Sequence, residues 1–295
     1  MLPASFPSPG EGVIHLGPLP LRAYALCIVL GAVAATAVAS RRWVHRGGRP
    51  GFVADLAVVA MPAAIVGARI YHLITSPQAY FGAGGHPLQA FAIWKGGLGV
   101  PGGVVAGLLA GIWFCRRHGV DWRLLAGPVA AAIPIGQVLG RFGNYFNQEL
   151  YGGPSTLPWA VRIDPAHRPV SSPGIATYQP TFAYEALWSL LVVFTVVTWA
   201  ERRFHLRGPQ CFALYAVLYA LGRGWVEALR IDPANHILGL RVNDWVSLLV
   251  VLGAGGYLLR SLRRDRALGV HRPDPTLPGT VPPAEPVPER EGVHA

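Results

Sequence analysis

Two charged side chains stand inside an otherwise apolar run. Arg223 and Glu227 fall within residues 211–229, and a spacing of four places them on one face of a helix, where they can pair. A charged side chain at the centre of a bilayer costs at least about 2.5–3.5 kcal/mol, so such residues are rarely idle. The pair is either a buried structural ion pair or a phosphate site in which Glu227 orients Arg223, and the two readings are compatible, because a guanidinium fork suits phosphate.

A second polar stretch, GRFGNYFNQELYG at residues 140–152, follows another apolar run. In it Arg141, Asn144, Asn147 and Glu149 supply a cation, two amides and a carboxylate. Its glycines permit close backbone approach or unusual turns. This composition indicates a site for a polar headgroup, and an ordinary polar turn is the alternative.

Further polar side chains fall near the ends of other apolar runs. They are Tyr24, Arg69, His72, Tyr184, Glu185, Asn243 and Asp244. Snorkelling toward water is the simple explanation for such positions. It accounts for Arg230, but not for Arg223, which lies about two helical turns deeper.

The elements that must position these residues are transmembrane helices. The chain of 295 residues is 52% hydrophobic and only 14% charged, whereas soluble domains carry about 25% charged residues. A spanning helix needs about 20 mostly apolar residues. Seven runs approach that length, at residues 21–40, 52–75, 96–115, 124–140, 182–200, 211–229 and 245–260. The sequence therefore predicts an all-α integral membrane protein with seven transmembrane helices.

Arginines predict the orientation of these spans. They follow the first, third, fifth and seventh runs, whereas the loop at residues 76–92 has no basic residue. Basic loops stay in the cytoplasm, so we expect a multi-pass protein of the bacterial inner membrane with its N-terminus outside and its C-terminus in the cytoplasm. The polar residues then cluster on the outer side, and the net charge of +10 reflects topology rather than nucleic-acid binding.

The sequence also predicts how the chain is divided. Residues 1–266 form a membrane catalytic domain with an outer loop or head at residues 141–181, and the proline-rich residues 267–295 form a disordered cytoplasmic tail. Glycines at 99, 103, 107 and 111 predict close helix packing, with a substrate-lining loop at residues 96–103 as the alternative. The three cysteines have no metal-ligand spacing.

Taken together, these motifs resemble the prolipoprotein diacylglyceryl transferase family. GRFGNYFNQELYG is the most specific of them. The others are ARIYHLI at 68–74, WKGGLGVPGG at 94–103, YQPTFAYEALW at 178–188 and YALGRGWVEALR at 219–230. The resemblance covers most of residues 15–260. It implies an enzyme that moves the diacylglyceryl group of phosphatidylglycerol onto the lipobox cysteine of a prolipoprotein signal peptide, forming a thioether and releasing glycerol phosphate.

The resemblance also implies a set of site residues. Catalytic positions are Tyr24, Arg141, Glu149, Arg223 and Glu227. Substrate-binding positions are Arg69, Asn144, Asn147, Gly152, Tyr184, Glu185, Tyr219 and Arg230. To these we add His72 as a substrate-binding residue, because of its place near the outer end of the second apolar run. We expect Arg141 and Arg223 to clamp the phosphate and Glu227 to fix Arg223. The expected partners are phosphatidylglycerol, the signal peptide and membrane lipid, with no cofactor, metal or nucleic acid.

Four positions depart from the family pattern. Pro101 stands where many members have a histidine favoured as catalytic base, and Lys95 where an acidic residue is common. Gln179 and Phe182 replace a histidine and a glutamine. The proton acceptor is therefore open among Glu149, Glu185 and His72, or a cationic pocket lowers the pKa of the substrate thiol enough that no base is needed.

Two other classes of membrane protein fit less well. A transporter for an organic anion or lipid would use arginines in an outer cavity, but it requires access from both leaflets, and the sequence has no internal repeat. An intramembrane protease needs a Ser–His or paired-aspartate arrangement within the spans. Ser189 and Ser247 have no obvious histidine partner in the sequence.

Overall fold

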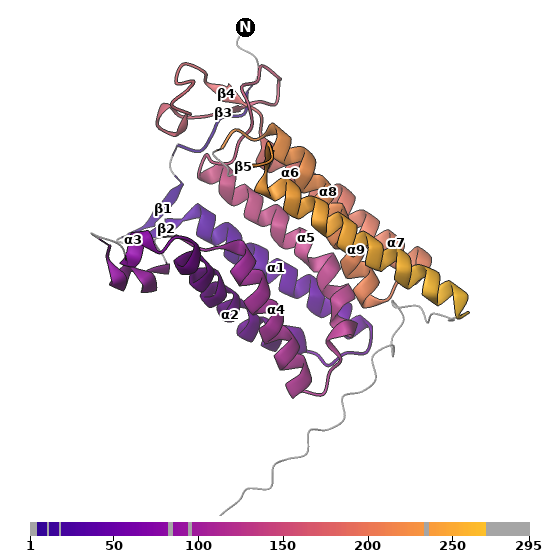
Figure 1. Cartoon of the computed structure of the whole chain (residues 1–295). Coiled ribbons are helices and arrows are strands. Elements are labelled where there is room, and N and C mark those ends of the chain that lie inside the picture. Colours follow the sequence, from indigo (N-terminus) through magenta and orange to yellow (C-terminus); the bar gives the residue numbers. More distant parts are fainter. Residues whose placement is uncertain are drawn as a thin grey trace, which may run out of the picture. The chain divides into compact units, whose positions relative to one another are not determined.

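A computed structural model describes residues 5–10, 12–17, 19–81, 85–93, 96–232 and 236–269. Lys95 and the proline-rich segment after residue 269 lie outside the described residues. The chain is mostly helical and forms two compact units (Figure 1). The first unit takes its described residues from positions 1–39 and 126–277, and the second from positions 40–125.

Long helices build the first unit. They are most of α1 (Ala23–His45), α5 (Trp122–Phe146), α8 (Gly208–Leu229) and α9 (Val242–Ala267). A further helical segment over residues 181–204 consists of α6 (Thr181–Leu187), the π-helical stretch η4 (Trp188–Phe194) and α7 (Thr195–Phe204). Helix α8 lies along α9 and along the 181–204 segment, so it is central to this unit.

Small residues and buried side chains bring the helices of the first unit together. A Cβ atom on Gly31 of α1 would lie 2.9 Å from the carbonyl oxygen of Gly136 on α5, so the two backbones touch. Val193, Val197 and Cys211 are fully buried in one hydrophobic cluster between α8 and the 181–204 segment. Burial of these side chains sets the rotation of each helix, and hence which polar residues face one another.

The second unit is built on α2 (Phe52–Thr75) and α4 (Val100–Arg117), with α3 (Gln78–Phe81) and the 3-10 turn η1 (Pro87–Phe91) between them. Cβ atoms on Gly103 and Gly107 would lie 3.1 and 3.2 Å from atoms of Ala64. The predicted small-residue packing is confirmed at these two positions. It is wrong for Gly111, whose Cβ would meet no described atom within 4 Å.

Short strands connect the helices. Three two-stranded antiparallel sheets pair β1 (Val13–Leu16) with β2 (Leu19–Arg22), β3 (Val161–Arg162) with β4 (Thr177–Tyr178), and β5 (His236–Ile237) with β6 (Leu240–Arg241). The loop between α5 and α6 also carries the 3-10 turn η3 (Pro165–His167) and a small core around Tyr151 and Tyr178. Burial is the main cause that raises the pKa of Tyr151, and the neighbouring Tyr178 is the second. The Tyr151 hydroxyl donates a hydrogen bond to the His167 carbonyl.

Five helical segments among the described residues are long and apolar enough to cross a membrane: α1, α2, α5, the 181–204 segment and α9. The other two predicted spans, 96–115 and 211–229, are also helical, as α4 and α8. They are less apolar, since α4 ends in two arginines and α8 contains Arg223 and Glu227.

The prediction for the fourth span was too short. Helix α5 continues to Phe146, so Arg141 and Asn144 lie within its last turns rather than after it. Polar residues in those turns had indicated a loop, although the helix there is stabilised by contacts with the rest of the first unit. The predicted start of the third span was too early, because α4 begins at Val100.

Candidate active site

The centre of the candidate site is one carboxylate shared by two guanidinium groups. Glu185 Oε2 lies 2.5 Å from Arg141 Nε, and Glu185 Oε1 lies 2.7 Å from Arg223 Nη1. The Glu185 side chain is 7% exposed, and those of Arg141 and Arg223 are 20% and 15% exposed. Three helices, α5, α6 and α8, therefore converge on a nearly buried cation–anion–cation arrangement.

The π-helical stretch η4 follows α6, the helix of Glu185, and packs against α8. Trp188 opens this stretch and donates from its indole nitrogen to the Leu218 carbonyl at 2.9 Å. The indole ring occupies the space that a side chain at Gly222 would need. Short π-helical stretches are frequent at functional sites. Here Trp188 packs on Gly222, the residue before Arg223, and so holds α6 against α8.

Glu227 lies at the centre of a second cluster of ion pairs and hydrogen bonds. Its carboxylate lies 2.5 Å from Arg223 Nη2 and 3.2 Å from Arg241 Nη1, and it accepts a hydrogen bond from Asn243 Nδ2 at 3.1 Å. Arg230 Nη1 lies 4.0 Å away. The pair of Arg223 with Glu227 that the spacing predicted is therefore present. The Glu227 side chain is 1% exposed, so its charge is balanced within the protein.

Sequence reasoning missed Arg241 and Asp232. Arg241 bonds the carbonyls of Glu227 and Asp232, and Arg230 Nε donates to Asp232 Oδ1 at 2.6 Å. Burial opposes ionisation of Asp232, but the Arg230 hydrogen bond and the charges of Arg230 and Arg241 outweigh it and lower its pKa. Arg241 lies outside the apolar runs and motifs from which the site residues were predicted. The signal that could have marked it is Asp244 three residues later, whose carboxylate caps the Arg241 backbone N–H at 3.1 Å.

Two amide side chains of the 140–152 stretch bind Glu149. Asn144 Nδ2 and Asn147 Nδ2 donate to Glu149 Oε1 at 2.8 and 3.3 Å. Arg141 Nη1 in turn donates to Asn144 Oδ1 at 3.4 Å. Tyr24 of α1 packs against this turn, since a Cβ on Gly143 would lie 2.7 Å from its ring. The predicted residues of this stretch thus join the Arg141 end of the arrangement.

These contacts form one continuous chain, the ionic network. It comprises Arg141, Arg223, Arg230, Arg241, Glu149, Glu185, Glu227 and Asp232, linked in part through Asn144. Its guanidinium and carboxylate groups are equal in number, so their charges balance. Among the described residues, no group bonds Arg141 Nη2 or Arg223 Nε, so each guanidinium retains a donor for an incoming anion.

Gly152 joins the loop between α5 and α6 (residues 147–180, the head loop) to the end of α8. It pairs with Arg230 as an isolated β-bridge, and its N–H donates to the Gln179 carbonyl at 2.8 Å. A Cβ there would lie 2.8 Å from the Leu229 carbonyl oxygen and 2.9 Å from Thr181 Cγ2. No side chain fits without displacing backbone, which explains glycine at this position.

Two predicted tyrosines lie beside the ionic network on its own helices. Tyr184 precedes Glu185 on α6, and its hydroxyl accepts a hydrogen bond from Trp159 Nε1 at 2.9 Å. Tyr219 lies one turn before Arg223 on α8 and stacks on Tyr215, with ring centroids 6.0 Å apart. Tyr184 therefore lies on the helix that carries Glu185, and Tyr219 on the helix that carries Arg223.

Arg69 and His72 belong to the second unit. Arg69 donates to four backbone carbonyls, those of Gln89, Ala90, Gly96 and Gly97. Its guanidinium also lies over the Tyr80 ring, 5.0 Å from the centroid. The donors of Arg69 thus hold two short segments, residues 89–90 and 96–97, in place.

His72 contacts the second of these segments. Its ring meets Tyr80 edge-on at 5.9 Å, and a Cβ on Gly97 would lie 2.7 Å from both His72 and Arg69. Pro101 follows in the first turn of α4, where its fixed φ and missing N–H suit a helix start. The described residues contain no group of three or more His, Cys, Asp or Glu that could hold a metal ion.

Known proteins resemble this chain over most of its length. The family model for prolipoprotein diacylglyceryl transferase matches residues 11–260. Phosphatidylglycerol–prolipoprotein diacylglyceryl transferase 2 of Streptomyces coelicolor is 51% identical over 88% of this chain and 82% of the relative. The corresponding enzymes of Frankia alni and Mycobacteroides abscessus are 53% and 45% identical, over 86% and 87% of this chain and 67% and 78% of the relatives. The chain therefore belongs to the prolipoprotein diacylglyceryl transferase family.

Proposed function

We propose that this chain transfers the diacylglyceryl group of phosphatidylglycerol to the lipobox cysteine thiol of prolipoproteins, the first step of lipoprotein maturation. One observation carries the proposal beyond family membership. Arg141 and Arg223, from different helices, share Glu185 at 2.5 and 2.7 Å and each retains a donor. Two guanidinium groups held at a short, fixed separation suit the two non-bridging oxygens of a phosphodiester.

The reaction is a displacement at the glyceryl carbon that carries the phosphate. The cysteine sulfur forms a C–S bond to that carbon, the C–O bond to phosphate breaks, and glycerol phosphate leaves with the electron pair. Arg141 and Arg223 stabilise the charge that develops on the departing phosphate. The reactive form of the substrate is the thiolate, so its proton must be removed near the site.

Glu149 is the proton acceptor in this proposal. Glu185 and Glu227 are each engaged by two or more arginines, whereas Glu149 accepts side-chain hydrogen bonds, within the described part of the chain, only from the amides of Asn144 and Asn147. These amides orient the carboxylate and bind the headgroup glycerol. The chain has proline at position 101, so this assignment does not depend on a histidine there.

The remaining predicted residues position substrates and elements. Glu227 and Arg230 fix Arg223 and the end of α8, and Gly152 holds the head loop against it. Tyr24, Tyr184 and Tyr219 line the path to the arginines. In the second unit, Arg69 and His72 position residues 96–97 for substrate binding.

We further propose seven spans, with α4 and α8 crossing the membrane beside the five more apolar segments. The C-terminal arginines of α9 and those after α1, α4 and α7 then lie in the cytoplasm. The ionic network and the head loop face outward, where phosphatidylglycerol of the outer leaflet and a translocated lipobox peptide meet. Residues 1–266 act as the membrane catalytic domain of a bacterial inner-membrane enzyme.

The test is a mass-shift assay with a lipobox peptide and phosphatidylglycerol. Wild-type protein should add one diacylglyceryl group to the cysteine. Arg141→Ala and Arg223→Ala should each lower the rate by at least about 100-fold, the loss typical for one stabilising group at a developing charge. The control is Arg162→Ala, which removes an exposed arginine of the head loop. Wild-type activity in either site variant would exclude the clamp, and an unmodified wild-type peptide would exclude the reaction.

A further inference from the structure

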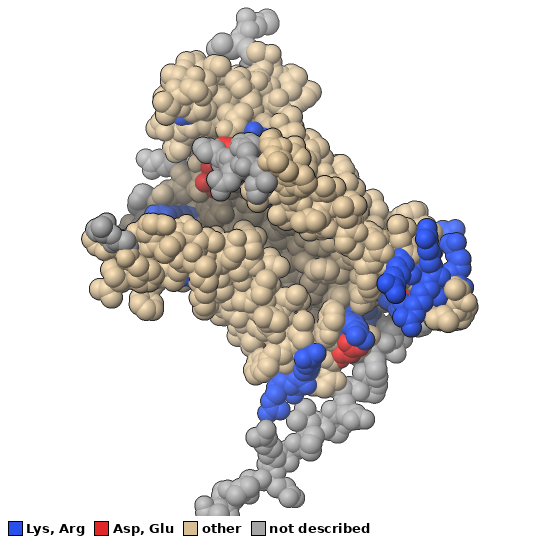
Figure 2. Space-filling view, viewed as in Figure 1, with Lys and Arg blue, Asp and Glu red and all other residues tan. Residues whose placement is uncertain are grey.

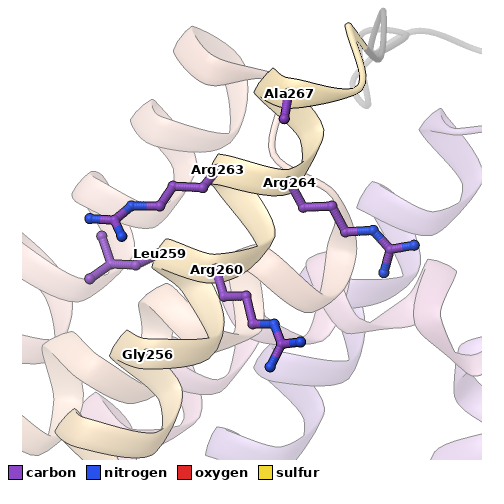
Figure 3. A pocket seen from close by; sticks show the side chains of 6 residues that line it. All are labelled: Gly256, Leu259, Arg260, Arg263, Arg264 and Ala267. Carbon is purple, nitrogen blue, oxygen red and sulfur yellow. The ribbon is translucent and has the colours of Figure 1, made fainter.

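The C-terminal half of α9 carries a groove that the proposed reaction does not use. It encloses about 550 Å³ and is lined by Gly256, Leu259, Arg260, Arg263, Arg264 and Ala267. Figure 3 shows Arg260 and Arg264 extending on one side of the helix, and Leu259 and Arg263 on the other. The side chains of one helix therefore form both walls of the groove. Arg260 and Arg264 form one wall, Leu259 and Arg263 form the other, and each wall carries guanidinium groups.

The charge of these walls is not balanced within the described residues. Asp265, the acidic side chain of these turns, is 3% exposed and turned toward α8, where it accepts from Arg207 at 2.6 Å and from Gln210 at 2.7 Å. No carboxylate among the described residues pairs with Arg260, Arg263 or Arg264. Figure 2 shows basic side chains gathered at this end of α9. The groove therefore attracts an anion.

The same groove is open and apolar toward the middle of α9. A Cβ on Gly256 would meet no described atom within 4 Å, so the helix surface is bare there. Leu259 is 58% exposed and Leu252, one turn before Gly256, is 62% exposed. Because α9 is long and apolar enough to cross a membrane, an apolar track leads from the bilayer to the arginines. A ligand that satisfies both parts has an acyl chain and an anionic head.

We propose that this groove binds an anionic phospholipid of the cytoplasmic leaflet. The phosphodiester lies between the arginine walls, and one acyl chain lies along Gly256 and Leu252. Basic pockets on the cytoplasmic side of membrane helices bind anionic headgroups in this way. The site is separate from the ionic network and binds a lipid that does not react. The assignment to the cytoplasmic leaflet uses the orientation proposed above.

A photoreactive phosphatidylglycerol tests the site on the full chain in detergent. The probe carries a diazirine on its acyl chain, and labelled peptides are mapped as a function of probe concentration. Labelling within residues 252–269 is expected in the wild type. The Arg260→Gln, Arg264→Gln double variant should need about 30-fold more probe, because each basic group near an anionic surface contributes roughly a fivefold factor.

Two single variants separate a built groove from a merely basic surface. Gly256→Leu fills the groove without changing charge and should abolish this labelling, while leucine favours the helix. Arg266→Gln removes the same charge from an exposed residue of α9 that does not line the groove, and it should change the half-saturating concentration less than about twofold. Equal losses in Arg266→Gln and the double variant, or undiminished labelling in Gly256→Leu, would overturn the proposal.

Competition identifies the ligand. Unlabelled phosphatidylglycerol should displace the probe, whereas phosphatidylcholine with the same chains and free glycerol phosphate should not. Displacement by either of the latter two would refute an anionic-lipid site. Diacylglyceryl transfer to the lipobox peptide, measured in parallel, should be unchanged in both groove variants and in Arg266→Gln. Loss of groove labelling is thereby distinguished from failure of the proposed reaction.

Discussion

Replacing Glu185 by glutamine removes one negative charge while preserving the shape of the side chain. In the wild type its two oxygens lie 2.5 Å from Arg141 Nε and 2.7 Å from Arg223 Nη1. The two guanidinium groups thus flank one carboxylate, and two like charges roughly 6 Å apart repel each other by about 3 kcal/mol at an effective dielectric constant of about 20. Removing one partner of a buried ion pair costs about 3–5 kcal/mol. We expect Glu185→Gln to lower the free energy of unfolding by that amount.

The same substitution should also slow diacylglyceryl transfer by about 100-fold, because misplacing a positioning group by about 1 Å has that effect. If Glu185 only positions the arginines, the loss in kcat/KM is constant from pH 6.5 to 9. If Glu185 accepts the thiol proton, the loss shrinks as pH approaches the thiol pKa of about 8.5. Glu149→Gln, by contrast, should show that pH-dependent recovery.

Glu201→Gln is the matched control. Glu201 is a fully buried carboxylate in α7, near the far end of the same 181–204 segment. Its substitution should destabilise the protein but leave the rate per folded molecule unchanged. The reasoning fails if Glu185→Gln keeps the wild-type rate per folded molecule, or if its deficit disappears at high pH.

Four further substitutions probe packing and charge. Gly152→Ala should abolish transfer in the mass-shift assay, because its Cβ would lie 2.8 Å from the Leu229 carbonyl oxygen; normal activity would show that the head loop tolerates displacement. Gly103→Leu should lower the unfolding free energy by about 1–3 kcal/mol through overpacking, whereas Gly111→Leu, with no described atom within 4 Å, should be nearly neutral. Because the pKa of Asp232 is lowered in the folded protein, its ionised carboxylate stabilises the fold at pH values above the unfolded pKa of about 3.9. This stabilisation is lost as the pH falls through the folded pKa. Asp232→Asn should therefore lower the melting temperature at pH 6, and by progressively less as the pH is lowered below about 3.9; a deficit that does not shrink on acidification would contradict this.

Much of this protein follows from local sequence, because a bilayer imposes length and apolarity on every segment that crosses it. The helices at 52–75 and 211–229, and the ion pair of Arg223 with Glu227, depend only on such local rules. The family motifs likewise identified the reaction class, and they marked Glu185 as a site residue before its contacts were known.

The tertiary structure decided which polar groups meet. Glu185 could pair with both arginines, and Arg241 could reach Glu227, only once buried side chains had set the rotation and depth of four helices. The guanidinium of Arg69 bonds the backbone carbonyls of residues 89, 90, 96 and 97, a set of contacts that no spacing in the chain predicts. Helical periodicity relates residues within a turn or two, whereas contacts between helices depend on packing summed over the whole interface.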